Sequence, residues 1–160
     1  MTPLVLADPP SWRGAANARN LTSAALRMTY RLQPHGAHHG GTSGALLMVT
    51  RSEAVLAGSV LRALAPRPIH VVANAAMSQA VPLGVLTAAG DVPLSGPYAV
   101  TTQRTVLAAL LDERAVALAG STVPVGYLVA LTGVAVMPVV LFGAEGKVAT
   151  DPPRPRTRID

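Results

Sequence analysis

The chain contains no cysteine and very few aromatic residues. Without cysteine it has no disulfide framework, no thiolate zinc site and no cysteine nucleophile. Aromatic residues make up 3% of its 160 residues, which argues against the nucleic-acid modules that stack bases on aromatic rings. We therefore expect neither a disulfide-stapled protein nor a nucleic-acid-binding one.

Charged residues are also scarce, at 13% of the chain. With eight acidic residues in total, a convergent pair of catalytic carboxylates is not expected. The formal net charge is +5, and twelve of the thirteen basic residues are arginines. They are scattered along the chain, apart from Arg154, Arg156 and Arg158 near its end. One interpretation is the codon bias of a GC-rich bacterial genome. The other is an anionic partner, such as a phospholipid surface or the phosphate of CoA or of a carrier protein.

Half of the residues are hydrophobic, so the chain can bury the core of one ordinary domain. Residues 115–144 carry no formal charge, and this length is sufficient to cross a bilayer. Pro124 and Pro138 interrupt the stretch, and we interpret it as buried strands and a packed helix instead. No secretory signal pattern begins the chain. The expected location is cytoplasmic, with peripheral contact to the inner membrane as an alternative.

Short apolar runs alternate with helical patterns, which predicts an α/β fold with a largely parallel mixed sheet flanked by helices. Residues 1–13 are expected to form an irregular leader, 14–149 a single α/β domain, and 150–160 a solvated tail rich in Pro and Arg. The predicted strands are 45–50, 69–74, 92–94, 115–119 and 134–142. The predicted helices are 17–32, 51–65, 75–89, 97–114 and 121–131, with Ser52 capping the second and Gly133 the last.

The helix predicted at 17–32 is basic and amphipathic. Its apolar positions are Leu21, Ala24, Ala25, Met28 and Leu32. Packing of this face against the domain is one interpretation. The other is binding to an anionic membrane surface through Arg19, Arg27 and Arg31.

Histidine and serine supply the remaining candidates for chemistry. The glycine-rich loop 34–44 contains His35, His38 and His39, but it has no carboxylate nearby, and we predict no metal site there. His70 lies within an apolar run and is interpreted as a core residue. Ser121 follows the strand at 115–119, at the edge where α/β proteins place ligands, but no partner acid for a serine nucleophile is evident.

Five segments follow one another in a characteristic order. The first, GALLMVTRSEAVLAG, is an apolar strand followed by Arg51-Ser52; RPIHVVANAAM, AAGDVPLSG and RAVALAGST come next, and TGVAVMPVVLFG is last. Over residues 44–146 this order resembles the glycerolipid acyltransferase family, the enzymes that acylate lysophosphatidate and related acceptors. The resemblance implies their α/β fold, a groove for acyl-CoA or acyl-carrier protein, and no further cofactor.

The family's catalytic residues are missing from this chain. In the family a His removes a proton from the acceptor hydroxyl and an Asp five residues later orients it; these positions are Thr50 and Val55 here. The Pro-Glu-Gly-Thr-Arg turn is shortened to residues 119–122, without its acid or its Arg. The positions that the resemblance leaves as substrate-binding candidates are Arg51, Ser52, Ser95, Gly120 and Ser121.

We therefore expect a degenerate, non-catalytic acyltransferase-like protein of bacterial phospholipid metabolism. Its role would be to bind a fatty-acyl chain or acyl thioester, or to act as a subunit of a lipid-metabolising or membrane-associated complex. The alternative is an active acyltransferase that transfers a fatty acyl group to a lysophospholipid-type acceptor with non-standard residues. In that case His35, His38 or His39 would swing into the vacant His position.

Overall fold

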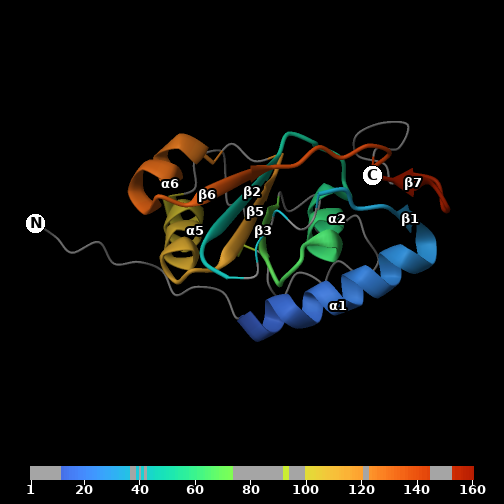
Figure 1. Ribbon diagram of the computed structural model, residues 1–160, viewed down its shortest axis with the longest axis horizontal. Coiled ribbons are helices and arrows are strands. Elements are labelled where there is room, and N and C mark those ends of the chain that lie inside the picture. Colours follow the sequence, from blue (N-terminus) through green and yellow to red (C-terminus); the bar gives the residue numbers. More distant parts are fainter. Residues whose placement is uncertain are drawn as a thin grey trace, which may run out of the picture.

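The fold is an α/β sandwich built on a parallel sheet of five strands in the order β4-β3-β5-β2-β6 (Figure 1). The computed structural model describes residues 12–36, 39, 41, 43–73, 92–93, 100–120, 123–144 and 153–160. The strands are β1 (Arg31–Leu32), β2 (Leu46–Thr50), β3 (His70–Ala73), β4 (Val92–Pro93), β5 (Ala115–Ala119), β6 (Ala135–Pro138) and β7 (Arg158–Ile159). The helices are α1 (Trp12–Thr29), α2 (Ala57–Leu64), α5 (Val100–Leu111) and α6 (Val125–Thr132).

The sheet confirms the predicted α/β class and sharpens it. Every strand pairing that the structure describes is parallel, so the antiparallel part of the predicted mixed sheet is not found among these strands. β2 lies in the interior of the sheet, paired with β5 on one side and β6 on the other. The helix predicted at 75–89 lies outside the described residues.

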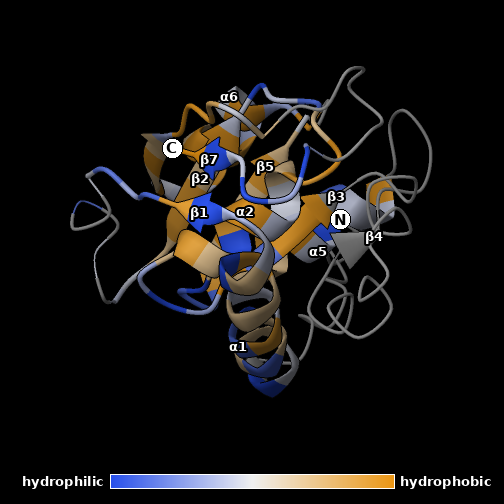
Figure 2. Cartoon of the chain, turned by 90° about the vertical axis from the view of Figure 1, so that its right-hand side faces the viewer, coloured by the Kyte–Doolittle hydropathy of each residue, from blue (hydrophilic) through white to orange (hydrophobic). Residues whose placement is uncertain are grey.

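Alternate residues of the central strands enter two separate cores, which explains why these strands are apolar throughout. Leu46 and Met48 of β2 belong to the core beneath α1 and α2, whereas Leu47 belongs to the core beneath α5 and α6. Figure 1 shows the two helix groups on opposite sides of the sheet, and Figure 2 shows the strands between them coloured as hydrophobic. β5 places its alanines toward α2, and such small side chains allow close packing.

The first helix begins earlier than predicted and buries a different face. It starts at Trp12 and ends at Thr29, so part of the expected leader is helical and Leu32 belongs to β1. The residues that it buries are Ala15, Ala18, Thr22 and Leu26, whereas Leu21 and Met28 are exposed. The predicted face was wrong because the buried face of α1 consists mainly of small residues, with Leu26 as the large apolar side chain among them.

The second helix is shorter than predicted, and Ser52 does not cap it. α2 begins at Ala57, with Leu56 at its N-cap position and no side-chain hydrogen bond capping it. Ser52 instead accepts a hydrogen bond from the Ala54 N–H with its Oγ atom at 3.3 Å. Such local side-chain bonds compete with helix formation, so residues 51–56 form a turn between β2 and α2.

The next two helices also differ from the prediction at their ends. α5 ends at Leu111, because Glu113 adopts a left-handed φ of 55° and the Arg114 N–H bonds to the Ala109 carbonyl at 2.9 Å. α6 begins at Val125 rather than at 121. Gly133 caps it as predicted, with a φ of 64° and its N–H bonded to Val129.

The expected solvated tail is part of the fold over residues 153–160. β7 pairs with β1 in parallel, and Ile159 is fully buried in the core beneath α1 and α2. Tyr30 donates its hydroxyl to the Pro153 carbonyl at 3.2 Å, and Phe142 and Asp160 exchange two backbone hydrogen bonds. The Pro and Arg content of this segment predicted a solvated tail, but Ile159 anchors the segment in the core.

The uncharged stretch 115–144 contains β5, α6 and β6 and is only partly buried. β5 is buried throughout, as predicted. Leu128 is the buried residue of α6, and β6 is mostly exposed, which corrects the expectation of a wholly buried stretch. Within the part of the chain that the structure describes, no helix has the length and apolarity needed to cross a membrane.

Candidate functional site

The carboxyl ends of β2 and β5 bring several of the sequence candidates together. The Gly120 N–H donates to the Thr50 carbonyl at 3.3 Å, so the turn after β5 lies against the turn after β2. The Ser52 carbonyl and the Glu53 backbone pack against Gly120. Arg51, Ser52 and Gly120 are therefore neighbours, whereas Ser95 and Ser121 lie outside the described residues.

The two positions at which the resemblance implies catalytic residues are occupied by buried side chains. Thr50 is buried, and its Oγ1 accepts a hydrogen bond from the Ser52 N–H at 3.2 Å. Val55 belongs to the core beneath α1 and α2. A hydroxyl engaged in a turn and a core valine supply no general base at this edge of the sheet.

A groove of about 560 Å³ opens beside these turns; we call it the sheet-end groove. Thr50, Arg51 and Ser52 form its polar end. Its remaining lining is apolar and comes from Val49, Val125, Val136, Pro138, Val139, Val140 and Leu141. Arg51 is its charged lining residue, so the groove offers a cation beside an apolar wall.

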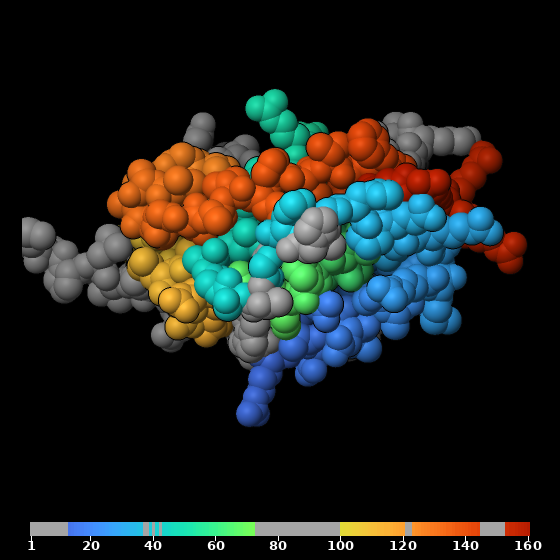
Figure 3. Space-filling model, in the orientation of Figure 1, coloured from blue at the N-terminus to red at the C-terminus, as the bar shows by residue number. Residues whose placement is uncertain are grey.

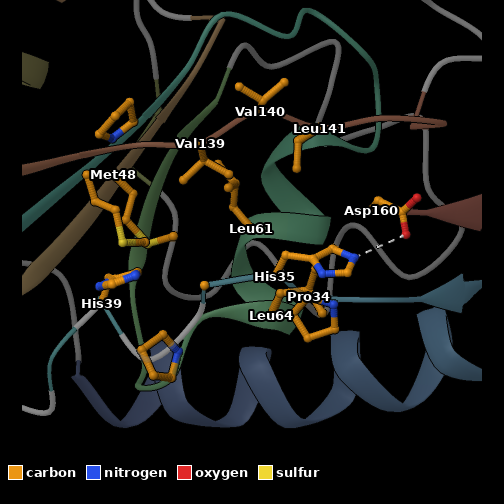
Figure 4. A pocket seen from close by; sticks show the side chains of 14 residues that line it. Pro34, His35, His39, Met48, Leu61, Leu64, Val139, Val140, Leu141 and Asp160 are labelled. Carbon is orange, nitrogen blue, oxygen red and sulfur yellow. Dashed lines mark ion pairs between the residues drawn. The ribbon is translucent and has the colours of Figure 1, made fainter.

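A smaller cavity of about 240 Å³ lies between the loop histidines, α2 and β6; we call it the helix-side pocket (Figure 4). Its apolar lining residues are Pro34, Met48, Leu61, Leu64, Pro66, Met137, Pro138, Val139, Val140 and Leu141. His35, His39 and Asp160 are its ionisable lining residues. Segment 138–141 lines both this pocket and the sheet-end groove, and so forms the partition between them.

The ionisable groups of the helix-side pocket stand at its ends. Figure 4 shows His35 facing Asp160 at one end and His39 beside Met48 at the other. The His35 Nε2 atom is 3.9 Å from Asp160 Oδ1, and the His35 side chain is 73% exposed. Asp160 is also held by Arg158, whose Nε donates to both carboxylate oxygens at 2.8 and 3.0 Å.

Sequence reasoning missed Asp160 entirely. It assigned the segment around Asp160 to a solvated tail, and no local motif marks this aspartate. The signal in the sequence was Ile159, the single large aliphatic residue of the segment 150–160. Its burial fixes the register of β7 and places Asp160 near the loop histidines. His38 lies outside the described residues, and among those described no group of three or more His, Asp or Glu could hold a metal ion.

Two further basic residues lie away from the sheet-end groove and the helix-side pocket, Arg62 buried and Arg67 half-buried. Arg62 of α2 is 2% exposed, and burial lowers its pKa to about 10. Burial also lowers the pKa of Arg67, whose guanidinium donates to the Gly44 carbonyl. His70 is fully buried in β3, as predicted for a core histidine.

A third hollow, of about 510 Å³, lies near the amino ends of the strands. Its lining residues are Ser43, Gly44, Arg67, Pro68, Asp112, Glu113 and Arg114. Arg114 pairs with Asp112 at 2.6 Å, so the charges there compensate one another. This mixed lining selects no single class of ligand.

Comparisons of the chain with models of protein families, with curated proteins and with solved structures found no match. The resemblance to the glycerolipid acyltransferases therefore stays a hypothesis. The functional argument depends on the helix-side pocket, the sheet-end groove and the residues that line them.

Proposed function

We propose that this protein binds the hydrocarbon chain of a fatty acyl group in the helix-side pocket. The observation that carries the proposal is the distribution of its lining: aliphatic side chains from β2, α2 and β6 in the middle, ionisable groups at the ends. Burial of a methylene group is worth about 0.8 kcal/mol, so an apolar cavity of this kind favours a hydrocarbon chain.

The size of the pocket limits what it holds. Sites for drug-sized molecules measure roughly 300–1,000 Å³, and this pocket, at about 240 Å³, is smaller. The acyl chain therefore enters, while a bulky head group such as CoA stays outside. A binding protein needs no general base, which agrees with the loss of the family's His at Thr50.

Thermal unfolding with long-chain acyl-CoA tests the proposal, with free CoA and the free fatty acid as controls. A ligand at a hundred times its dissociation constant stabilises by about 2.7 kcal/mol. For a domain of this size each kcal/mol raises Tm by about 2–4 °C, so the expected rise is roughly 5–11 °C. We expect the rise with acyl-CoA and not with CoA, and no rise at saturating, sub-micellar ligand would contradict acyl binding.

A matched pair of variants locates the ligand. Leu64 lines the helix-side pocket and Val125 lines the sheet-end groove, and both side chains are half-buried. Leu64→Trp should fill the pocket and abolish the rise in Tm, whereas Val125→Trp should leave it intact. The reverse pattern would move the ligand to the sheet-end groove.

A second candidate function, acyl transfer to a hydroxyl acceptor, is favoured by one observation. His35 faces Asp160 at 3.9 Å, and a histidine beside a carboxylate is a candidate general base. Transfer of a labelled acyl chain to lysophosphatidate tests it. Removal of a true base lowers the rate about 10²- to 10⁴-fold, so His35→Ala should abolish transfer while His39→Ala should not. Transfer that survives His35→Ala would rule out this base.

A further inference from the structure

Large apolar side chains are exposed along one continuous segment, from α6 through β6 to Phe142. We call these residues the apolar strip: Tyr127, Leu131, Val136, Val140 and Phe142. Val140 and Phe142 are 67% and 65% exposed. In Figure 3 the segment 123–144, in orange, runs as one band along the upper part of the molecule. Contiguous apolar surface of this kind marks contact with another protein or with a membrane.

The strip is poorly suited to the addition of a strand from another protein. β6 is the outermost strand of the sheet, and the Val139 N–H points inward to the Val49 carbonyl. Because backbone groups alternate along a strand, the backbone nitrogen of Pro138 points outward, where proline offers no N–H. Pro138 therefore disfavours the addition of a further strand at the free edge of the sheet. A partner of the strip would instead contact its exposed side chains.

An exposed cation beside the strip, Arg51, suits an anionic surface. No residue from 115 to 144 is charged. At one end Arg51 is exposed and lines the sheet-end groove together with Val136 and Val140. At the other end the backbone of Gly143 lies against the carbonyl of Arg158, whose charge is compensated by Asp160 at 2.8 Å, so Arg51 is the cation on which the match depends. Each basic residue near an anionic bilayer contributes about 1 kcal/mol.

The strip also continues into the helix-side pocket. Val140 belongs to the strip and lines both the pocket and the groove. A hydrocarbon chain that leaves a bilayer under the strip would reach the pocket without crossing water. This continuity distinguishes a lipid surface from a protein partner, and this step rests on the proposed function.

We propose that the apolar strip docks on an anionic phospholipid bilayer. The strip would lie at the boundary between head groups and acyl chains, as interfacial segments do, with Arg51 against the phosphates. This surface differs from the outer face of α1, the membrane surface that the sequence suggested. On α1, the Arg19 Nε donates to the Ala65 carbonyl at 3.0 Å and is therefore not directed at lipid phosphates.

Co-sedimentation with vesicles tests the docking, using phosphatidylcholine with and without phosphatidylglycerol. We expect the full chain to sediment with the anionic vesicles, and less so as salt is raised. The double variant Val140→Asp/Phe142→Asp should lower binding about tenfold or more, and Arg51→Gln about fivefold. Met28→Asp and Leu111→Asp are matched controls, since both residues are exposed and apolar but lie on α1 and α5. Thermal unfolding of each variant verifies its fold.

Three outcomes would overturn the proposal. One is the absence of vesicle binding. The second is binding that Met28→Asp abolishes and the strip variants do not, which would assign the membrane contact to α1. The third is a dimer that the strip variants dissociate, without vesicle binding, which would make a second copy the occupant. Acyl-CoA stabilisation, measured without vesicles, reports separately on the proposed function.

Discussion

Gly120 packs directly against the backbone of Ser52. A Cβ atom at Gly120 would lie 3.2 Å from the Ser52 carbonyl oxygen, and its φ of +54° lies in the left-handed region that favours glycine. A side chain at position 120 would therefore force the backbone of Ser52 to shift by a few tenths of an ångström. This packing holds Thr50, Arg51 and Ser52 at the end of the sheet-end groove.

Gly120→Ala should destabilise the protein more than Gly133→Ala. Gly133 has a φ of +64° but open space around its Cβ position, so alanine there costs about 1–2 kcal/mol for the backbone alone. At Gly120 the displacement of Ser52 adds to that cost. Urea unfolding of the two variants measures the difference, and equal losses would show that the contact with Ser52 adds nothing.

Ile159→Ala should lower the free energy of unfolding by about 2–5 kcal/mol, because Ile159 is fully buried. Arg156→Ala, an exposed change in the same segment, should have little effect. Urea unfolding compares the two. If both variants unfold like the wild type, residues 153–160 do not contribute to the core.

Arg19→Met should cost about 1–3 kcal/mol, because the guanidinium loses its hydrogen bond to Ala65 and leaves that carbonyl without this donor. Arg27→Met is the matched change on the same helix, and Arg27 is exposed. Its effect on chemical unfolding should be small. A similar cost for both would mean that the hydrogen bond from Arg19 to Ala65 adds nothing to stability.

The sequence predicted the parts of the fold that depend on local pattern. The run AVALA at 115–119 is β5 without an error at either end, because a strand buried on both faces is apolar at every position. Gly133 was recognised as a cap for a similar local reason. The turn at 51–56 was missed because Ser52 and Glu53 also look like the start of a helix, and only tertiary contact with Gly120 shows otherwise.

The candidate site was less accessible to prediction. The resemblance grouped Arg51, Ser52 and Gly120, and the structure places them together because parallel strands end at one edge of the sheet. The pairing of His35 with Asp160 joins residues far apart in the sequence through β1 and β7, strands of two residues each. Strands this short leave no periodicity to read, so only the three-dimensional arrangement brings these two residues to one pocket.

Arg62 should make stability rise at high pH. Burial lowers its pKa to about 10, well below the ordinary value for arginine. Below pH 10 both the folded and the unfolded chain hold this proton, so the group adds no pH dependence. Above pH 10 the folded state releases the proton first, the unfolded state binds more protons, and stability increases by at most about 1.4 kcal/mol per pH unit.

Burial raises the pKa of Tyr30, which gives stability the opposite pH dependence in the wild type and in Arg62→Met alike. The difference in stability between the two proteins therefore isolates the effect of Arg62. Tyrosine with a raised pKa loses stability as pH rises, because the unfolded state ionises first. Urea unfolding at pH 8 to 11 should therefore show wild type gaining stability relative to Arg62→Met above pH 10. A difference that stays constant over this range would mean that Arg62 keeps its proton in the folded state and that its burial is offset by its interactions.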